Sequence, residues 1–486
     1  MLRKKQKEIL FIFYNLCSHE ISSKDLSIKL GISKRAVKDS IKELNSLIFE
    51  YYDLQNFIEI TANGIVFIQP DFQSKSLVIF HQLKLDLLKK SYDFQIITHI
   101  FFSKSSTLVN LSEKLYLSIS YTNRLLKNLN KYLVKFRYQI VEDDNGFLKL
   151  HGNELYIRLY IYILLSNSYQ MLEFPFNTNH LPNHQYSKEN FDFSILTSII
   201  DQRSSYKNFL PELSEPLLSF IKISEKNLDL YKIINNNLIF DFQFLTNPNE
   251  RGYLHFFSHI FISNNIPRQL KLDIGHHYLL NADTDFSYFV SELVNKFWEA
   301  FNLNYDSIKI SQTAYYVSLF TIYLNITGID FYNFNELSFP QSNYNMNTSN
   351  HQYKKIKKYI ELFTTNHADN KFALFLLENP LLQDFYCGIL YTQSEHSSFP
   401  SLKIHINLSK LFMSQDFMIE RLTSIYNKDI IIFCDSPIDA DLIITDHLSN
   451  KDTGLEIFYF DTLSDVDQWK KLLSLIEDLI FNKLVT

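Results

Sequence analysis

The sequence has little glycine and little cysteine, and both shortages exclude classes of protein. Only nine of the 486 residues are glycine, and they lie singly, so no glycine-rich dinucleotide or phosphate loop and no GxSxG elbow can be written. Cys17, Cys387 and Cys434 contain no CxxC pair and are too few for a disulfide framework, which is typical of a reducing cytoplasm. No stretch approaches the roughly 18 uninterrupted apolar residues of a membrane span. We therefore expect a cytoplasmic protein with no membrane segment, no cofactor, no metal and no catalytic residue.

The positively and negatively charged residues are unevenly distributed along the chain. The formal net charge is −6. Residues 1–150 hold 22 Lys and Arg against 15 Asp and Glu, a balance of +7, so the remainder carries −13. A basic third joined to an acidic remainder indicates a polyanion-binding region attached to a different module. A hydrophobic content of 46% is enough for several folded domains.

A helix-turn-helix pattern lies at residues 22–48, within the basic third. Ser22 and Asp25 have the spacing of a capping box that opens a short helix. Gly31 suits the left-handed end of that helix, and Ser33 can cap a second helix. Such a unit inserts its second helix into the major groove of DNA. The predicted DNA contacts of this first unit are Ser33, Lys34, Arg35, Lys38 and Lys42.

The same pattern recurs at residues 110–133. Asn110 and Glu113 match a capping box, residues 117–119 make the turn, and Ser120 is the expected cap of the second helix. Asparagine, arginine and threonine side chains read base edges, whereas lysine mainly holds phosphate. The predicted DNA contacts of this second unit are Ser120, Tyr121, Thr122, Asn123, Arg124, Lys127 and Asn128.

A β-hairpin, or wing, is predicted after each unit. The turns are Asn63-Gly64 and Asn145-Gly146, the strongest short hairpin signal. Lys149 can bring the second wing to the DNA backbone, whereas the acidic triplet before its turn must point away, unless that wing is only structural. A single helix-turn-helix pattern also fits helical hairpins that bind no DNA. Two winged copies inside the basic third favour DNA binding.

The second unit carries motifs of a known family. They are S-x-S before the second helix, L-K-x-L-N-K-x-L within it, and G-N-E-x-x-I-R leading into the next helix. In these motifs the chain resembles the Mga and AtxA family of Gram-positive transcriptional regulators. The resemblance implies that the second unit, at Tyr121 to Lys127, matters most for DNA binding. Positive charge alone would instead favour the first unit, at Lys34 to Lys42, as the main DNA-binding unit.

From Glu154 onward the sequence reads as helices, with polar loops at 177–190, 341–353 and 391–401. The resemblance implies two regulatory domains of the phosphotransferase system, helical bundles whose histidines are phosphorylated. His255 and His259, four apart on one helix, also fit a buried pair that satisfies its own hydrogen bonds, or a metal site. The candidate phosphorylation sites are His180, His184, His255, His259 and His367.

The C-terminal piece alternates strands and helices, which predicts a small α/β sheet. It resembles a phosphotransferase IIB domain, whose catalytic cysteine follows the first strand. Asn407, Leu408 and Ser409 occupy that place, and Cys434 is expected at the end of the second strand instead. Without a thiolate there is no phosphocysteine, so we interpret this domain as a protein-contact module for dimerisation.

The predicted fold is multidomain and mainly α-helical, with two N-terminal winged helix-turn-helix domains, two helical-bundle regulatory domains and a small C-terminal IIB-like α/β domain. The predicted boundaries are 1–70 for the first winged unit, 71–153 for linking helices and the second winged unit, 154–282 and 283–395 for the helical regulatory domains, and 400–486 for the IIB-like domain.

These features predict a non-enzymatic transcriptional regulator, an activator, that binds promoter DNA as a double strand. Its expected partners are RNA polymerase, the phosphocarrier protein of the phosphotransferase system, and further copies of itself in a homodimer or higher oligomer. The alternatives are a IIB-like phosphotransferase component, which the missing cysteine disfavours, and an RNA-binding antiterminator. Antiterminators share the regulatory helical domains but usually begin with a small β-rich RNA module, which the sequence lacks.

Overall fold

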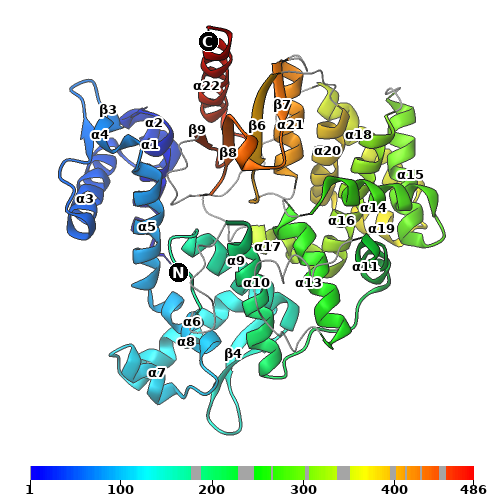
Figure 1. The fold of residues 1–486 in the computed structure, drawn as a ribbon. Coiled ribbons are helices and arrows are strands. Elements are labelled where there is room, and N and C mark those ends of the chain that lie inside the picture. Colours follow the sequence, from blue (N-terminus) through cyan, green and yellow to red (C-terminus); the bar gives the residue numbers. More distant parts are fainter. Residues whose placement is uncertain are drawn as a thin grey trace. The chain divides into compact units, whose positions relative to one another are not determined.

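The computed structural model is mainly helical, with a small parallel sheet near the C-terminus (Figure 1). Its described residues divide into two compact units. The first unit contains the described residues of 1–177, 333–341 and 466–471, and the second those of 178–332, 342–465 and 472–486. The structure describes residues 2–176, 188–227, 246–263, 266–301, 306–335, 351–394, 401–410, 413–426, 430–447 and 456–485.

The first unit begins with a three-helix domain and its sheet. The helices are α1 (Lys4–Ser18), α2 (Ser23–Leu30) and α3 (Lys34–Tyr52), and the antiparallel strands β1 (Ile21–Ser22), β2 (Ile58–Ile60) and β3 (Ile65–Ile68) have the order β1-β3-β2.

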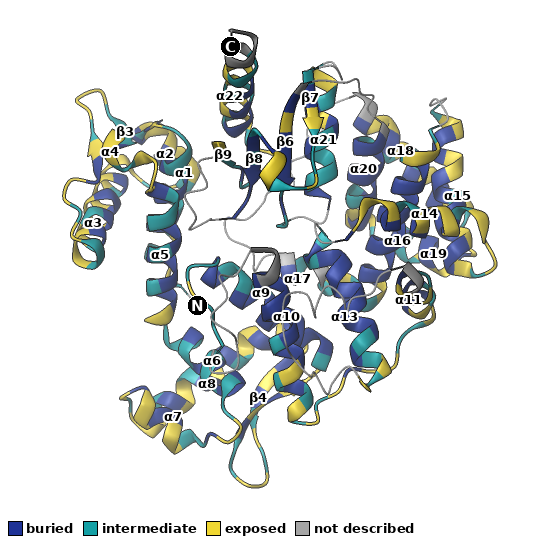
Figure 2. Ribbon diagram, in the orientation of Figure 1, coloured by how far each residue is buried: buried dark blue, intermediate teal, exposed yellow. Residues whose placement is uncertain are grey.

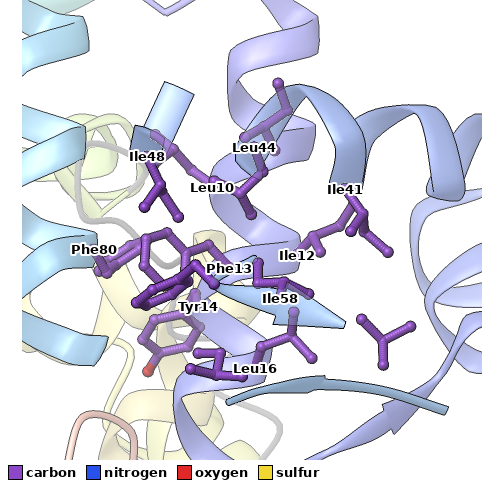
Figure 3. Close-up of a cluster of buried hydrophobic side chains, with 14 of the residues drawn as sticks. Leu10, Ile12, Phe13, Tyr14, Leu16, Ile41, Leu44, Ile48, Ile58 and Phe80 are labelled. Atoms are coloured by element: carbon purple, nitrogen blue, oxygen red, sulfur yellow. The ribbon is translucent and has the colours of Figure 1, made fainter. Parts of the chain in front are cut away.

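Aromatic and aliphatic side chains fill the core of this three-helix domain (Figure 3). Phe13 of α1 is fully buried and meets the rings of Phe57 and Phe80 edge to face, at centroid distances of 5.5 and 5.6 Å. Truncating a phenylalanine in such a core costs about 3–5 kcal/mol. The outer helices α2 and α3 are therefore held on a rigid base.

A second helical region with its own hairpin follows in the same unit. Its elements are α4 (Pro70–Gln73), α5 (Ser76–Lys89), α6 (Tyr92–Phe102), α7 (Leu108–Lys114), α8 (Ile119–Leu133), the 3-10 helix Val134–Phe136, the hairpin β4 (Tyr138–Glu142) and β5 (Leu148–Gly152), and α9 (Glu154–Tyr169). The hairpins predicted after both helix pairs are therefore confirmed.

The second unit opens with a helical region. Its helices are α10 (Lys188–Ser205), α11 (Glu215–Asn227), α13 (Pro248–Phe261), α14 (Arg268–Leu280), α15 (Asp285–Ala300), α16 (Ser307–Thr327), α18 (His351–Asn366), α19 (Lys371–Glu378) and α20 (Pro380–Ser394). The short α17 (Phe331–Asn335) follows α16, and its last three residues belong to the first unit. Residues 310–324, the central part of α16, are all buried (Figure 2). Gly275 of α14 lets the backbones of α14 and α16 touch, because a Cβ there would lie 1.7 Å from Ser311 O.

The chain ends in the predicted α/β piece. Strands β6 (Ser401–Asn407), β7 (Ile430–Phe433), β8 (Leu442–Thr445) and β9 (Glu456–Tyr459) form a parallel sheet in the order β7-β6-β8-β9, with α21 (Ser414–Ile425) after β6 and α22 (Val466–Val485) at the end.

The mainly helical fold and the small C-terminal sheet are confirmed, whereas the division into five domains stays a prediction. None of the described helices is long and apolar enough to cross a membrane.

Candidate nucleic-acid interface

The two helix-turn-helix units use the same cap at the start of their second helix. Ser33 Oγ accepts the backbone N–H of Ala36 at 3.2 Å, and Ser118 Oγ accepts that of Tyr121 at 3.3 Å. The predicted cap Ser33 is confirmed. The predicted cap Ser120 is wrong, because α8 already begins at Ile119 and Ser120 lies in its exposed first turn.

The first helix of the second unit is also misplaced in the prediction. Thr107, not Asn110, caps α7, and its Oγ1 accepts the Asn110 N–H at 3.2 Å. Thr107 therefore takes the place that Ser22 holds in the first unit, where Ser22 Oγ accepts the Asp25 N–H at 3.0 Å. The two units then correspond residue by residue through both helices and the turn.

An asparagine fixes the second helix to the first strand of the wing in both units. The Asn45 side chain donates to Ile58 O at 2.8 Å and accepts from Ile58 N–H at 2.9 Å. Asn130 makes the same pair of bonds with Ile140, both at 2.8 Å. These two asparagines were not predicted as wing contacts, although both helices carry a Leu-Asn dipeptide at this position, which could have indicated them. The repeated contact defines two equivalent scaffolds.

The outer face of α8 presents polar and basic side chains without a carboxylate. Asn123, Arg124, Lys127 and Asn128 are exposed, as is Ser120, and α8 contains no Asp or Glu. These exposures match the outward face predicted for the helix.

Two predicted contact residues on α8 have other surroundings. Thr122 is fully buried, and its hydroxyl donates to Ser118 O at 3.1 Å, so its predicted outward position is wrong. Tyr121 is half-buried and lies under the Arg124 guanidinium, whose carbon is 4.7 Å from the ring centroid. The ring holds the cation over its face, which reduces the number of side-chain conformations that Arg124 would have to give up on binding.

The outer face of α3 is different. Ser33, Lys34, Arg35, Lys38 and Lys42 are all exposed, as predicted. Three carboxylates are exposed on the same helix: Asp39 and Glu43 beside the lysines, and Glu50 near its end. Lys5 Nζ lies 3.8 Å from Glu43. The exposed side chains of α3 therefore carry charges of both signs, whereas those of α8 carry only positive charges.

The second wing is closed by an aspartate. Asp143 Oδ1 accepts the backbone N–H groups of Asn145 and Phe147 at 3.0 and 2.9 Å, and its other oxygen forms an ion pair with Lys149. The Lys149 ammonium and these amides lower the pKa of Asp143. Part of the acidic triplet is thus used inside the turn, and the charge of Lys149 is already balanced within the wing.

The G-N-E-x-x-I-R motif joins the second wing to α9. Gly152 has a φ of 145°, and a Cβ there would lie 2.4 Å from Arg137 O. Asn153 caps α9 through Tyr156 N–H at 3.2 Å. Arg158 Nε donates to Glu154 Oε1 at 2.9 Å, and both side chains are largely buried. The motif therefore has a structural role behind α8.

Residues 78–165, from within α5 to within α9, match the model of the Mga helix-turn-helix domain. The second helix-turn-helix unit is thus similar to the Mga helix-turn-helix domain. The capsule synthesis positive regulator AcpA of Bacillus anthracis is 30% identical over 152 residues, which are 31% of this chain and 29% of AcpA. A putative trans-acting regulator of Streptococcus pneumoniae serotype 4 is 28% identical over 178 residues, which are 36% of this chain and 34% of that protein.

A shorter match is to the capsule synthesis positive regulator AcpB of B. anthracis, 31% identical over 90 residues, or 18% of each chain. The matches thus span about a third or less of the length of these relatives. The resemblance to Mga- and AtxA-like regulators that the motifs predicted is confirmed. The structure and the match place the predicted contacts of α8 inside the Mga domain and those of α3 before it.

Two of the five histidine candidates are buried. His259 of α13 is fully buried, with Nδ1 2.9 Å from Tyr315 Oη and Nε2 2.9 Å from Ser224 Oγ. His255 lies 3.8 Å from Glu225, and burial lowers its pKa to about 4. Burial also lowers the pKa of His259 well below its usual value. Neither ring can meet a phosphoryl donor without local opening of the helices.

His367, directly after α18, is partly exposed. Its Nδ1 bonds to Phe363 O at 2.8 Å and its Nε2 faces Lys296 Nζ at 3.0 Å, with Glu292 3.9 Å away. It is the most exposed of the three described candidates. His180 and His184 lie outside the described residues. Within the described ranges, no group of three or more His, Cys, Asp or Glu side chains is arranged to hold a metal ion.

The loop after β6 is where a IIB domain would carry its cysteine and phosphate. Here the backbone N–H groups of Ser409 and Lys410 both donate to Asp446 Oδ2 at 2.7 Å. The amides that could hold an anion are therefore occupied by a carboxylate from the end of β8. Cys434 lies directly after β7, and burial raises its pKa. The sequence indicated the missing cysteine but not Asp446, which follows a neighbouring strand of the parallel sheet.

Proposed function

We propose that the chain is a non-enzymatic transcriptional regulator that binds double-stranded DNA through its two winged helix-turn-helix units, with α8 as the principal reading helix. The observation that carries this proposal is the outer face of α8. It presents exposed Asn123, Arg124, Lys127 and Asn128 with no carboxylate, inside the segment that matches the Mga helix-turn-helix domain.

The side chains of α8 divide by chemistry into base contacts and phosphate contacts. Arg124, oriented by the Tyr121 ring, can donate two hydrogen bonds to a guanine edge. Asn123 and Asn128 suit adenine, and Lys127 suits phosphate. Ser33, Lys34, Arg35, Lys38 and Lys42 of the first unit add contacts, with Asp39 and Glu43 reducing their effect. Lys149, held by Asp143, adds little charge.

The relatives AcpA and AcpB are named positive regulators of capsule synthesis. We extend activation to this chain, with RNA polymerase as the partner recruited at the promoter. The phosphocarrier protein of the phosphotransferase system would modulate it through His367, since that ring is the most accessible described candidate. The C-terminal α/β piece would join chains into a dimer or higher oligomer. Mass spectrometry of phosphohistidine tests the modification of His367, and analytical sedimentation tests the oligomeric state.

Salt titration of DNA binding tests the main proposal. For binding to duplex DNA, log K should fall with log salt with a slope of about −0.9 for each phosphate contact. Lys127→Ala should reduce the size of that slope by about 1. An affinity that does not change with salt would rule the proposal out. Hairpin RNA at the same ionic strength is the comparison for the antiterminator alternative, which predicts tighter binding to RNA than to DNA.

The IIB-like alternative makes a chemical prediction. It requires a phosphocysteine, and Cys434 is the cysteine that lies within the C-terminal α/β piece. Incubation with phosphorylated phosphocarrier protein should leave Cys434 unmodified if Asp446 and the absent cysteine disable the loop. A phosphocysteine in the mass spectrum would favour the alternative.

A further inference from the structure

Tyr116 has a backbone conformation and an exposure that the fold does not require. It lies in the turn between α7 and α8 with a φ of 54°, in the left-handed region, and its side chain is 95% exposed. The first unit has Gly31, with a φ of 63°, at the corresponding position. Glycine takes this conformation without steric cost, whereas a residue with a Cβ does not.

The side chain of Tyr116 gives no stabilisation in return. The turn is held by backbone bonds, in which Tyr116 N–H donates to Glu113 O at 3.1 Å and Leu117 N–H donates to Ser112 O at 2.9 Å. Glycine would make both bonds equally well. Among the residues that the structure describes, none contacts the Tyr116 hydroxyl or ring through a hydrogen bond or ring pairing. A strained, exposed aromatic residue that the turn does not need points to a contact outside the chain.

We infer that Tyr116 is a contact to the sugar–phosphate backbone of DNA, an inference that rests on the proposed function. Tyr116 lies two residues before Ser118, the cap of α8. In a helix-turn-helix unit the first helix crosses the DNA backbone and the N-terminal residues of the second contact base edges, so the turn between the two helices lies close to a phosphate strand. A phenol O–H donates to a phosphate oxygen, and tyrosine is among the side chains that make such contacts. The contact positions α8 and carries no sequence information.

Replacement by the residue of the first unit tests this assignment. In the full chain, Tyr116→Gly should weaken binding to a random-sequence duplex DNA pool about three- to tenfold, the effect of losing one hydrogen bond of typical net strength. The size of the log-salt slope should not change, because tyrosine carries no charge. The thermal unfolding midpoint should stay the same or rise, because the strain is removed. Tyr116→Phe, which keeps the ring and the strain, should lose most of the same affinity.

The outcomes separate the two hypotheses. A wild-type chain that binds no DNA would overturn the proposed function and this inference with it. Wild-type binding together with unchanged affinity in both variants would overturn only the inference. Unchanged DNA affinity with reduced transcription would assign Tyr116 to a protein partner instead. A loss confined to one DNA sequence would make it a base contact and also overturn the backbone assignment.

Discussion

The two winged units share a scaffold and differ on the surface that it presents. Both cap the second helix with a serine, both tie it to the wing through an asparagine, and both turn through a left-handed residue. The outer face of α3 mixes lysines with Asp39 and Glu43, whereas α8 has a stacked arginine and no acid. The two equivalent scaffolds therefore present surfaces of different chemistry. We interpret α3 as mainly electrostatic and α8 as the helix that reads sequence.

The largest expected effect tests whether the scaffolds are equivalent. Asn130→Ala removes two hydrogen bonds and leaves the Ile140 amide and carbonyl unpaired, which should cost about 2–3 kcal/mol. Asn45→Ala should cost a similar amount in the first unit. Hydrogen exchange followed by mass spectrometry should show faster exchange in β4 for the first variant and in β2 for the second. A loss in only one unit would show that the shared contact does not have a shared role.

The next largest effect should distinguish a side chain that reads base sequence from one that contributes only positive charge. Arg124→Ala should cost about 1–3 kcal/mol on a preferred sequence and less on random DNA, because a bidentate base contact is lost. Lys38→Ala should weaken binding to all sequences by a similar factor. Fluorescence anisotropy with both kinds of duplex measures these losses. Equal behaviour of the two variants would remove the distinction between α8 and α3.

The turns should respond in opposite directions. Gly31→Ala places a Cβ in a left-handed conformation and should cost about 1 kcal/mol. Tyr116→Gly should leave the second unit as stable as before or more stable. Denaturant unfolding, read together with hydrogen exchange in each unit, measures both changes. If Gly31→Ala has no effect, the turn is less restrictive than its φ indicates.

The carboxylates of α3 should have a smaller effect. Replacing Asp39 and Glu43 together by Asn and Gln makes the field of α3 resemble that of α8. DNA affinity should rise about two- to threefold at low salt, and the gain should shrink as salt screens it. Asp53→Asn, beyond the end of α3, removes one negative charge and serves as the control. A gain of the same size per removed charge in the control would attribute the change to net charge alone.

The smallest expected effect is a difference between the stabilities of the two wing turns at acid pH. Asp143 is held in its charged form, so its folded pKa lies below the unfolded value. Its contribution is present above the ordinary aspartate value of about 3.9 and is lost as the pH falls through the lower folded value. Thr61, which accepts Ile65 N–H at 3.0 Å in the first wing, does not titrate. The protection factors of the amides, which already account for the slower intrinsic exchange at acid pH, should therefore fall on acidification in the Asp143 turn and not in the Thr61 turn.

Local signals in the sequence predicted much of this architecture. The caps Ser22 and Ser33, the left-handed Gly31, both hairpin turns and the C-terminal alternation of strands and helices follow from spacing and turn chemistry, and the structure confirms them.

Other features depend on contacts between distant residues, which local patterns do not report. Ser118 and Ser120 are equally plausible caps by type, and only packing of the helix decides that Thr122 is buried. Asp446 meets the loop after β6 because parallel strands bring distant residues to one edge of a sheet. The strain at Tyr116 is invisible to sequence, because tyrosine is not expected in a left-handed turn.

Selection of bound duplexes from a random-sequence DNA pool tests the central claim most directly. The full chain, Arg124→Ala and Lys38→Ala would each be used to enrich bound sequences. The account predicts that Lys38→Ala enriches the same sequence motif as the wild type with lower yield, whereas Arg124→Ala loses the preference at one position of that motif. A motif that survives Arg124→Ala intact and changes with Lys38→Ala would contradict it.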